Sequence, residues 1–334
     1  MSETSPLAAA QQTFAAAVPF RAGGAESCDL AEALGRTLYR EVIAPADLPP
    51  YHRAIVEGFV VHTTDTAAAS EETPVSFAIV GTIKPGDERC PPLKNGQGLE
   101  VVTGVVMPDG AYSIVRMWEA KREGARFTIS RPFPPRFFIE DQGCDLKKGS
   151  VVASAGAVIG PAEIGTIAAL GITQVQAAKR PRVTVFACGD EVIPYDQALR
   201  PGMIRDSNSP MLCAAVNAAG GEAQNAGILR DDFDTFVTAA RAALGKSDML
   251  VISGGTAAGG GDFIANAVKA LGELLVDGVP MRSGRPLIMG VAQGKPIVCV
   301  AGHPPEALRG FRLFGAAALN RLLGRDVPLP EDKA

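Results

Sequence analysis

Residues 248–262, DMLVISGGTAAGGGD, carry the strongest structural signal in the sequence. MLVIS is a short apolar, partly β-branched run of the kind that forms a fully buried parallel strand. GGTAAGGG has almost no side-chain atoms, and FIANAVKAL then has helical apolar spacing, so a helix is predicted to begin near Asp262. A strand, a glycine-rich turn and a helix N-terminus favour phosphate binding. An ordinary βα turn would have the same appearance, because the run matches neither common nucleotide-binding glycine motif in full.

Strand-like and helix-like segments alternate around this stretch, from Arg182 onward. The expected strands are VTVFACG, AQNAGIL, MLVISGG, LIMGVA and PIVCVAG, and the expected helices are SPMLCAAVNAAGG, DFDTFVTAARAALGK, FIANAVKALG and PEALRGFRLFGAAALNRLL. Such alternation predicts a parallel or mixed sheet covered by helices on both faces, with ligands at the carboxyl ends of the strands. The residues at and after the ends of these strands are the first site candidates: Cys188, Gly189, Asp190, Glu191, Arg230, Asp231, Gly302 and His303.

The first half of the chain has a different character. Residues 5–20 and 29–43 are predicted to be helices, with Asp29 as the cap of the second. Residues 46–140 contain short apolar runs between Gly, Pro and Asp turns, which predicts a β-rich domain. We therefore expect an α/β multidomain fold: an elongated mixed domain from residues 1–45 and 141–178, a β-rich domain at 46–140, an α/β domain at 179–326, and a frayed tail at 327–334.

Composition narrows the function. A net charge of −4 gives no basic surface for nucleic acid. No apolar run reaches the roughly 18 residues of a membrane span, and the first residues have no cationic segment typical of a signal peptide. The six cysteines are scattered without a CxxC pair, which favours a reducing compartment. We expect a cytoplasmic protein that does not bind membranes.

Nine motifs, in order, resemble those of the MoeA / gephyrin E-domain family, the molybdopterin molybdenumtransferases. The resemblance covers residues 29–325. In this sequence the motifs read ADLPPYHRAIVEGFVV, VVTGVVMPDGAYSIVRMWE, QGCDLKKG, ACGDE, RDSN, GILRDD, SGGTAAGGGDF, RSGRP and AGHPPEA. GILRDD is the closest match, to the family's GIIRDD.

The resemblance implies a fold and a reaction. The fold is an elongated homodimer with a central MogA-like α/β domain that binds molybdopterin, and this chain stops where a further C-terminal β-domain would begin. The reaction takes adenylylated molybdopterin and molybdate as substrates, with Mg²⁺ as cofactor, splits the phosphoanhydride and releases AMP. Such chemistry needs a backbone cradle for phosphate, carboxylates for the metal and cations for the oxyanion.

The resemblance also implies residue roles. The catalytic candidates are Glu57, Thr103, Asp145, Glu191, Asp231 and Asp262, of which Asp262 and Glu191 would bind the metal. The candidates for the pterin phosphate and nucleotide are Gly189, Asp190, Ser253, Gly254, Gly255, Thr256, Gly259, Gly302, His303 and Pro304. Arg282 and Arg285 would form the oxyanion pocket. In the implied homodimer, Glu57 reaches the α/β domain of the other subunit, so that each site is composite.

Each role has an ordinary structural reading beside it. Asp262 could be only a helix cap, Asp231 a carboxylate beside a helix dipole, Glu191 and Asp145 solvated turn residues, and Thr103 a strand hydroxyl. His303 could be a new ligand or base, although a single loop histidine is more often neither.

Departures from the family motifs separate two functions. Arg282 and Arg285 replace two lysines and keep the positive charge. Donors are lost at Ala257 and Gly278, Ala301 replaces a proline, and His52, Arg53, Glu57, Ser283 and His303 also differ from the family. A diverged transferase is the first hypothesis, and a molybdopterin or nucleotide carrier or scaffold that has lost its chemistry is the second.

Overall fold

The computed structural model describes residues 5–255, 261–280 and 284–332. They form two compact units. Unit 1 combines residues 1–41, 153–165 and 172–334, and unit 2 combines residues 42–152 and 166–171. The four-part division expected from the sequence is finer than these two units and stays a prediction.

Unit 1 is built on a six-stranded sheet in the order β16-β13-β17-β20-β19-β18. The first four strands run parallel, whereas β18 and β19 pair antiparallel at one edge. Their bounds are β13 (Arg182–Cys188), β16 (Glu222–Leu229), β17 (Met249–Gly254), β18 (Glu273–Asp277), β19 (Ile288–Ala292) and β20 (Lys295–Val300). The expected sheet is therefore confirmed, and β18 is a strand that the periodicity did not reveal.

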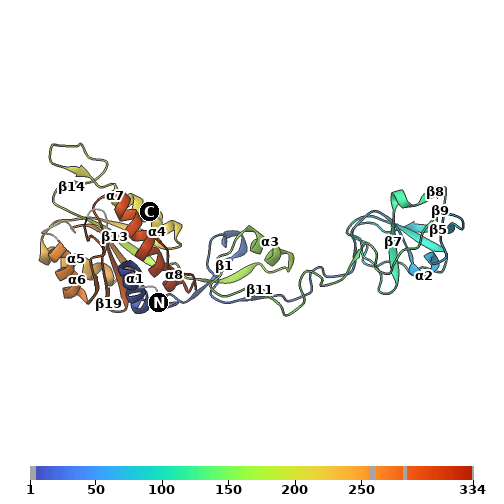
Figure 1. The fold of residues 1–334 in the computed structure, drawn as a ribbon, viewed down its shortest axis with the longest axis horizontal. Helices are drawn as coiled ribbons and strands as arrows, with labels where there is room; N and C mark the ends of the chain where they lie inside the picture. The colour runs from blue at the N-terminus through green and yellow to red at the C-terminus, as the bar shows by residue number, and fades with distance from the viewer. Residues whose placement is uncertain (1–4, 256–260, 281–283, 333–334) are drawn as a thin grey trace. The chain divides into compact units, whose positions relative to one another are not determined.

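Helices cover both faces of this sheet (Figure 1). Alternate residues of β17 supply the two cores: Met249 and Val251 face one, and Leu250 and Ile252 face the other. The first core is closed by α1 (Pro6–Ala17), α4 (Asn208–Ala218), α7 (Pro304–Gly310), a π-helix (Phe311–Gly315) and α8 (Ala316–Leu323). The second is closed by α5 (Phe233–Leu244) and α6 (Gly261–Leu271). Complete burial of both faces explains the near-continuous apolar strands.

Unit 2 contains a second six-stranded sheet, in the order β7-β4-β6-β5-β9-β8. The strands are β4 (Gly58–His62), β5 (Val75–Thr82), β6 (Gln97–Val101), β7 (Tyr112–Arg116), β8 (Lys121–Glu123) and β9 (Arg126–Ile129), with α2 (Thr63–Thr66) beside them. Three stacked rings, Phe59, Phe127 and Phe77, lie at its centre and are fully buried. The β-rich character expected for this region is confirmed.

The remaining strands are short. They are β1 (Ala25–Asp29), β2 (Val42–Ile43), β3 (Arg53–Ala54), β10 (Ile139–Glu140), β11 (Val151–Ala153), β12 (Gln174–Ala178), β14 (Val192–Ile193) and β15 (Ile204–Arg205), and the helix α3 spans Pro161–Ala169. Among the described helices, none has both the length and the apolar composition that crossing a bilayer requires.

The predicted helix at 29–43 is wrong. Asp29 ends strand β1, which pairs with β12, and its carboxylate accepts a hydrogen bond from Gln174 at 2.7 Å instead of capping a helix. A 3-10 turn follows at Leu30–Glu32, and Gly35 at a φ of +73° then turns the chain out of the helical region. Backbone pairing with residues more than a hundred positions later overrode the local helical pattern.

The C-terminal segment was predicted to be a frayed tail, but hydrogen bonds hold it to unit 1 up to Asp332. Gln11 of α1 donates to the carbonyl oxygen of Pro330 at 2.9 Å, and Arg309 Nε donates to Asp332 at 2.7 Å. The predicted helix at 5–20 is confirmed in part, because α1 ends at Ala17 and Val18 is extended.

A partly buried ion cluster in unit 2 surrounds the carboxylate of Glu119. Arg116 donates to it at 2.8 Å, and Arg131 forms a second ion pair with it. The Arg116 guanidinium also lies over the rings of Trp118 and Phe138, at 4.9 and 4.8 Å. The hydrogen bond that Arg116 donates is the largest cause that lowers the pKa of Glu119. Burial of the carboxyl group opposes it, and the hydrogen bond from Arg131 adds to it, so that the pKa falls to about 2.

We expect Glu119→Gln to lower the free energy of unfolding of unit 2 at pH 7 by about 1 kcal/mol. A depressed pKa stabilises the fold above the unfolded-state pKa of Glu, so the difference from wild type should shrink as pH falls from about 4.5 through about 2. Trp118 is the chain's single tryptophan, so its fluorescence during urea unfolding reports on unit 2.

Glu123→Gln is the matched control, because Glu123 pairs with Lys121 on the surface and both side chains are mostly exposed. It should leave the urea midpoint unchanged. Equal effects of the two substitutions, or a Glu119→Gln deficit that persists at pH 2, would contradict the role given to the cluster.

Candidate active site

Four parallel strands of unit 1 end at one edge of the sheet. They end at Cys188, Leu229, Gly254 and Val300, and parallel pairing aligns these ends. After β13, the next strand of this sheet along the chain is β16, which pairs on one side of β13. After β17, the next strand along the chain is β18, which lies in the opposite direction across the sheet. The strand order thus reverses between β13 and β17, which is where open α/β sheets bind ligands.

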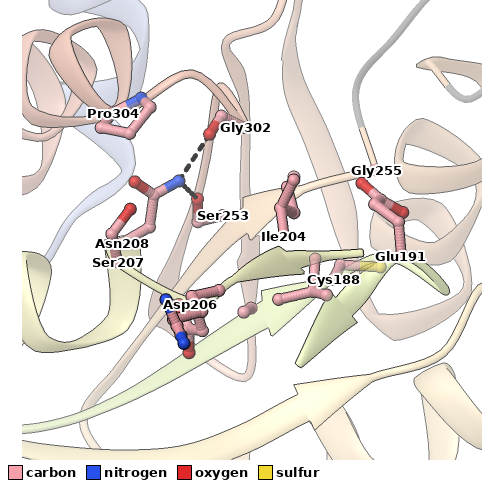
Figure 2. A pocket seen from close by; sticks show the side chains of 14 residues that line it. Cys188, Glu191, Ile204, Asp206, Ser207, Asn208, Ser253, Gly255, Gly302 and Pro304 are labelled. Atoms are coloured by element: carbon pink, nitrogen blue, oxygen red, sulfur yellow. Dashed lines mark hydrogen bonds between the residues drawn. The ribbon is translucent and has the colours of Figure 1, made fainter. Parts of the chain in front are cut away.

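A cavity of about 360 Å³ opens at this point. Seven of its lining residues were predicted from the sequence: Cys188, Glu191, Ser253, Gly254, Gly255, Gly302 and Pro304. The others were not, and they are Ala187, Val192, Ile204, Arg205, Asp206, Ser207 and Asn208. Figure 2 shows the pocket with Ser253, Gly255, Gly302 and Asn208 around it. The missed set includes all of RDSN, a motif in which the sequence analysis assigned no residue a role.

Two glycines form the start of the loop that follows β17. Gly254 has a φ of +95°, and a Cβ there would lie 2.3 Å from the carbonyl oxygen of Cys188. Gly255 has a φ of +67°, and its Cβ would lie 3.0 Å from Ile264 and 3.2 Å from the Cys188 sulfur. Only glycine fits both the backbone conformation and the space, so the absence of side chains at this strand end is a consequence of close packing against β13.

The carboxylates at the strand ends lie in a polar network. Cys188 Sγ donates to Asp231 Oδ1 at 3.3 Å, and Arg230 donates to the carbonyl oxygen of Asp190 at 2.7 Å. Burial, more than the neighbouring Asp231 carboxylate, raises the pKa of the Cys188 thiol. Cys188 is therefore a neutral hydrogen-bond donor to Asp231 rather than a thiolate nucleophile.

The pocket has donors suited to Mg²⁺. Glu191 is exposed and Asp206 is buried, and both line the cavity. Asp262 lies in the first turn of α6, which begins at Gly261, one residue before the predicted start, and its side chain is outside the described part. Among the described residues no group of three His, Cys, Asp or Glu side chains is close enough to hold a metal alone. Mg²⁺ usually takes one or two carboxylates together with substrate phosphates, which this donor set fits.

The structure describes only some of the other predicted site residues of unit 1. Thr256, Gly259 and Arg282 lie outside the described residues, as do Ala257 and Ser283. His303 is exposed and precedes α7 without capping it. Arg285 is exposed and donates to the carbonyl oxygen of Gly278 at 2.7 Å. A Cβ at Gly278 would lie 2.8 Å from Arg285 Cβ, so Arg285 occupies the space beside this position.

Three predicted residues belong to unit 2. Glu57, Thr103 and Asp145 are all exposed there. Asp145 lies 3.8 Å from Arg53, which also donates to Glu140 at 2.6 Å and whose pKa that hydrogen bond raises. The cation at position 53, a departure from the family motif, thus lies beside Asp145. The catalytic roles of these three residues stay predictions.

Two protein-family models match almost the whole chain. The MoeA N-terminal region (domain I and II) matches residues 5–171, and the family described as "Probable molybdopterin binding domain" matches residues 184–321. The chain belongs to the MoeA family. The resemblance in the sequence motifs is thereby confirmed.

Relatives of this MoeA family member agree in sequence and in fold. A molybdopterin molybdenumtransferase of Staphylococcus epidermidis is 28% identical over 91% of this chain and 73% of its own length, and one of Staphylococcus aureus is 29% identical over 88% and 71%. A crystal structure of a molybdopterin biosynthesis MoeA protein from Pyrococcus horikoshii matches with a TM-score of 0.82 at 31% identity, covering 97% of this chain and 81% of the other. The multidomain α/β fold class of this MoeA family member is thus confirmed.

We expect Gly254→Ala to lower the free energy of unfolding of unit 1 by about 3 kcal/mol, because the new Cβ meets backbone and the positive φ becomes strained. Gly302→Ala changes the same pocket, but its Cβ would meet nothing closer than 3.7 Å and should cost far less. Guanidinium unfolding followed by circular dichroism measures both. If both substitutions lower the free energy of unfolding equally, the close approach of β17 to β13 is not what requires glycine at position 254.

Proposed function

We propose that this chain is a molybdopterin molybdenumtransferase of molybdenum cofactor biosynthesis. The observation that carries the proposal is the position of the pocket: it opens at the reversal of strand order, inside the region that matches the molybdopterin-binding family. A glycine turn, two carboxylates and the α4 N-terminus line it together. This combination suits a phosphorylated, metal-assisted substrate better than an apolar ligand.

The proposed substrates are adenylylated molybdopterin and molybdate. Gly254 and Gly255 line the pocket at the end of β17 and Gly189 follows the end of β13, so a phosphate there would meet backbone rather than side chains. Gly302, His303 and Pro304 lie at the end of β20, on the same edge of the sheet, where they can contact the rest of the nucleotide. The Asp231 N–H donates a weak hydrogen bond to Asp190 Oδ1 at 3.4 Å, which links the residues that follow β13 and β16.

Mg²⁺ is the proposed cofactor, held by Glu191 and Asp262. When bound, it would neutralise phosphate charge during cleavage of the phosphoanhydride. Among the protein's own groups, the Cys188 thiol orients the Asp231 carboxylate by donating a hydrogen bond to it. Glu57, Thr103 and Asp145 complete the proposed catalytic set, and a homodimer is the proposed assembly.

The test is incubation with adenylylated molybdopterin, Mg²⁺ and molybdate, followed by chromatography of AMP. We expect AMP release and molybdenum on the dithiolene, at rates well above a control without protein. Asp231→Asn keeps the shape but removes the charge that the Cys188 thiol orients, and it should lower turnover by about a hundredfold. The matched control is Asp234→Asn, an exposed position in the first turn of α5.

The second candidate, a carrier without turnover, is favoured by one observation. The Arg285 guanidinium is already bound to the carbonyl oxygens of Gly278 and Asp277, at 2.7 and 3.3 Å. These hydrogen bonds occupy some of the donors of the guanidinium, which leaves fewer donors for an oxyanion. Tight pterin binding with no AMP above the control would support the carrier and reject the transferase.

We propose that Arg282 and Arg285 bind the oxyanion, and we expect Arg282→Ala with Arg285→Ala to weaken tungstate or molybdate binding by about tenfold or more in calorimetry. Arg285 is exposed, so its loss should leave the unfolding midpoint nearly unchanged. The pair Arg241→Ala and Arg312→Ala, with Arg241 and Arg312 on α5 and the π-helix, removes the same charge away from the pocket. Unchanged oxyanion affinity in the first variant would move the oxyanion site elsewhere.

A further inference from the structure

A buried amide connects three elements at the floor of the pocket. Asn208, the first residue of α4, donates from Nδ2 to Ser253 Oγ and to the carbonyl oxygen of Gly302, both at 2.7 Å. Ser253 in turn donates to the carbonyl oxygen of Ala301 at 3.1 Å. Figure 2 shows the amide nitrogen directed at Gly302 and Ser253. The network thus joins α4 to β17 and to the turn between β20 and α7.

The chemistry of these partners fixes the amide in one orientation. The carbonyl of Gly302 can only accept, so it must face the NH₂ end of the amide. The Ser253 hydroxyl has one proton, which it gives to Ala301, so it too must accept from Asn208. A flipped amide would set an oxygen against the carbonyl oxygen of Gly302.

The other end of the amide has no such partner. Asn208 is only 8% exposed, and among the described residues no donor lies within hydrogen-bond distance of its Oδ1. A buried acceptor without a donor destabilises the folded protein, so an asparagine here is not explained by stability. What the residue does achieve is the alignment of two strand ends that line the pocket.

We infer that Asn208 is a positioning residue that holds the glycine turn after Ser253 and the turn at Gly302 in register for the ligand. Gly254 and Gly255 follow Ser253 directly, and Pro304 follows the Gly302 turn. Losing the two donated hydrogen bonds frees both turns at once. The inference rests on the proposed function, since it names the residue that shapes the pterin nucleotide pocket.

The decisive variant is Asn208→Asp, which keeps the size but replaces the NH₂ donor with an acceptor. We expect affinity for adenylylated molybdopterin, measured by quenching of pterin fluorescence, to fall by about tenfold at pH 8. Protonation of the introduced carboxyl restores one donor, so part of the loss should be recovered at pH 5. Glu191 and Asp206 also line the pocket, but they are present in every variant, and wild type at each pH corrects for them.

Asn217→Asp is the matched control on the same helix. Its side chain is exposed and uses Oδ1 to accept from the Ala223 N–H, a role that a carboxylate keeps. It has the same change in charge and should bind pterin as wild type does. If Asn208→Asp and Asn217→Asp bind equally well, Asn208 does not position the site.

A second measurement covers the case in which Asn208→Asp fails to fold. Asn208→Ala removes the donors without adding charge, and hydrogen exchange of peptides covering residues 249–255 and 297–303 should rise in this variant while exchange elsewhere in the sheet stays unchanged. Unchanged exchange at both turns overturns the inference. Wild-type protein that binds no pterin, while exchange still rises in Asn208→Ala, rejects the proposed function and leaves the positioning role standing.

Discussion

The parallel pairing of β13 with a strand on each side is the constraint on which unit 1 depends. Because β16 and β17 flank β13 in parallel register, three strand ends meet at one edge, and the reversal of strand order leaves an opening there. The register also brings Gly254 against the carbonyl oxygen of Cys188, so no side chain fits at that strand end. The pairing of the strands thus creates the pocket and determines where its polar residues lie.

Patterns that depend on burial were readable from the sequence, and those that depend on distant partners were not. MLVIS and VTVFAC became β17 and β13 because strands covered on both faces must be apolar throughout. Residues 29–43 had helical spacing but pair with residues 151–178 instead. Strand β18 is only five residues long and lies at the sheet edge, where its pattern ELLVD has no clear period.

The candidate site divides in the same way. Residues that directly follow a strand, such as Glu191, Gly254 and Gly302, could be placed at the pocket because strand ends converge. Asn208 begins a helix, and only the fold brings its amide to Ser253 and Gly302. Cys188 looked like a core residue, and its contact with Asp231 depends on the alignment of two strands. Such contacts cannot be predicted from the sequence until the order of the strands in the sheet is known.

The first helix, α1, completes the core of a sheet formed mostly from the second half of the chain. Phe14 and Val18 pack with Val276, Met289 and Leu319, so residues near the two ends of the chain share one apolar cluster. Unit 2 lies between them in the sequence and has its own core. During synthesis, therefore, unit 2 has all of its strands outside the ribosome long before unit 1 does. The apolar face of helix α1 therefore stays uncovered until the last helices emerge.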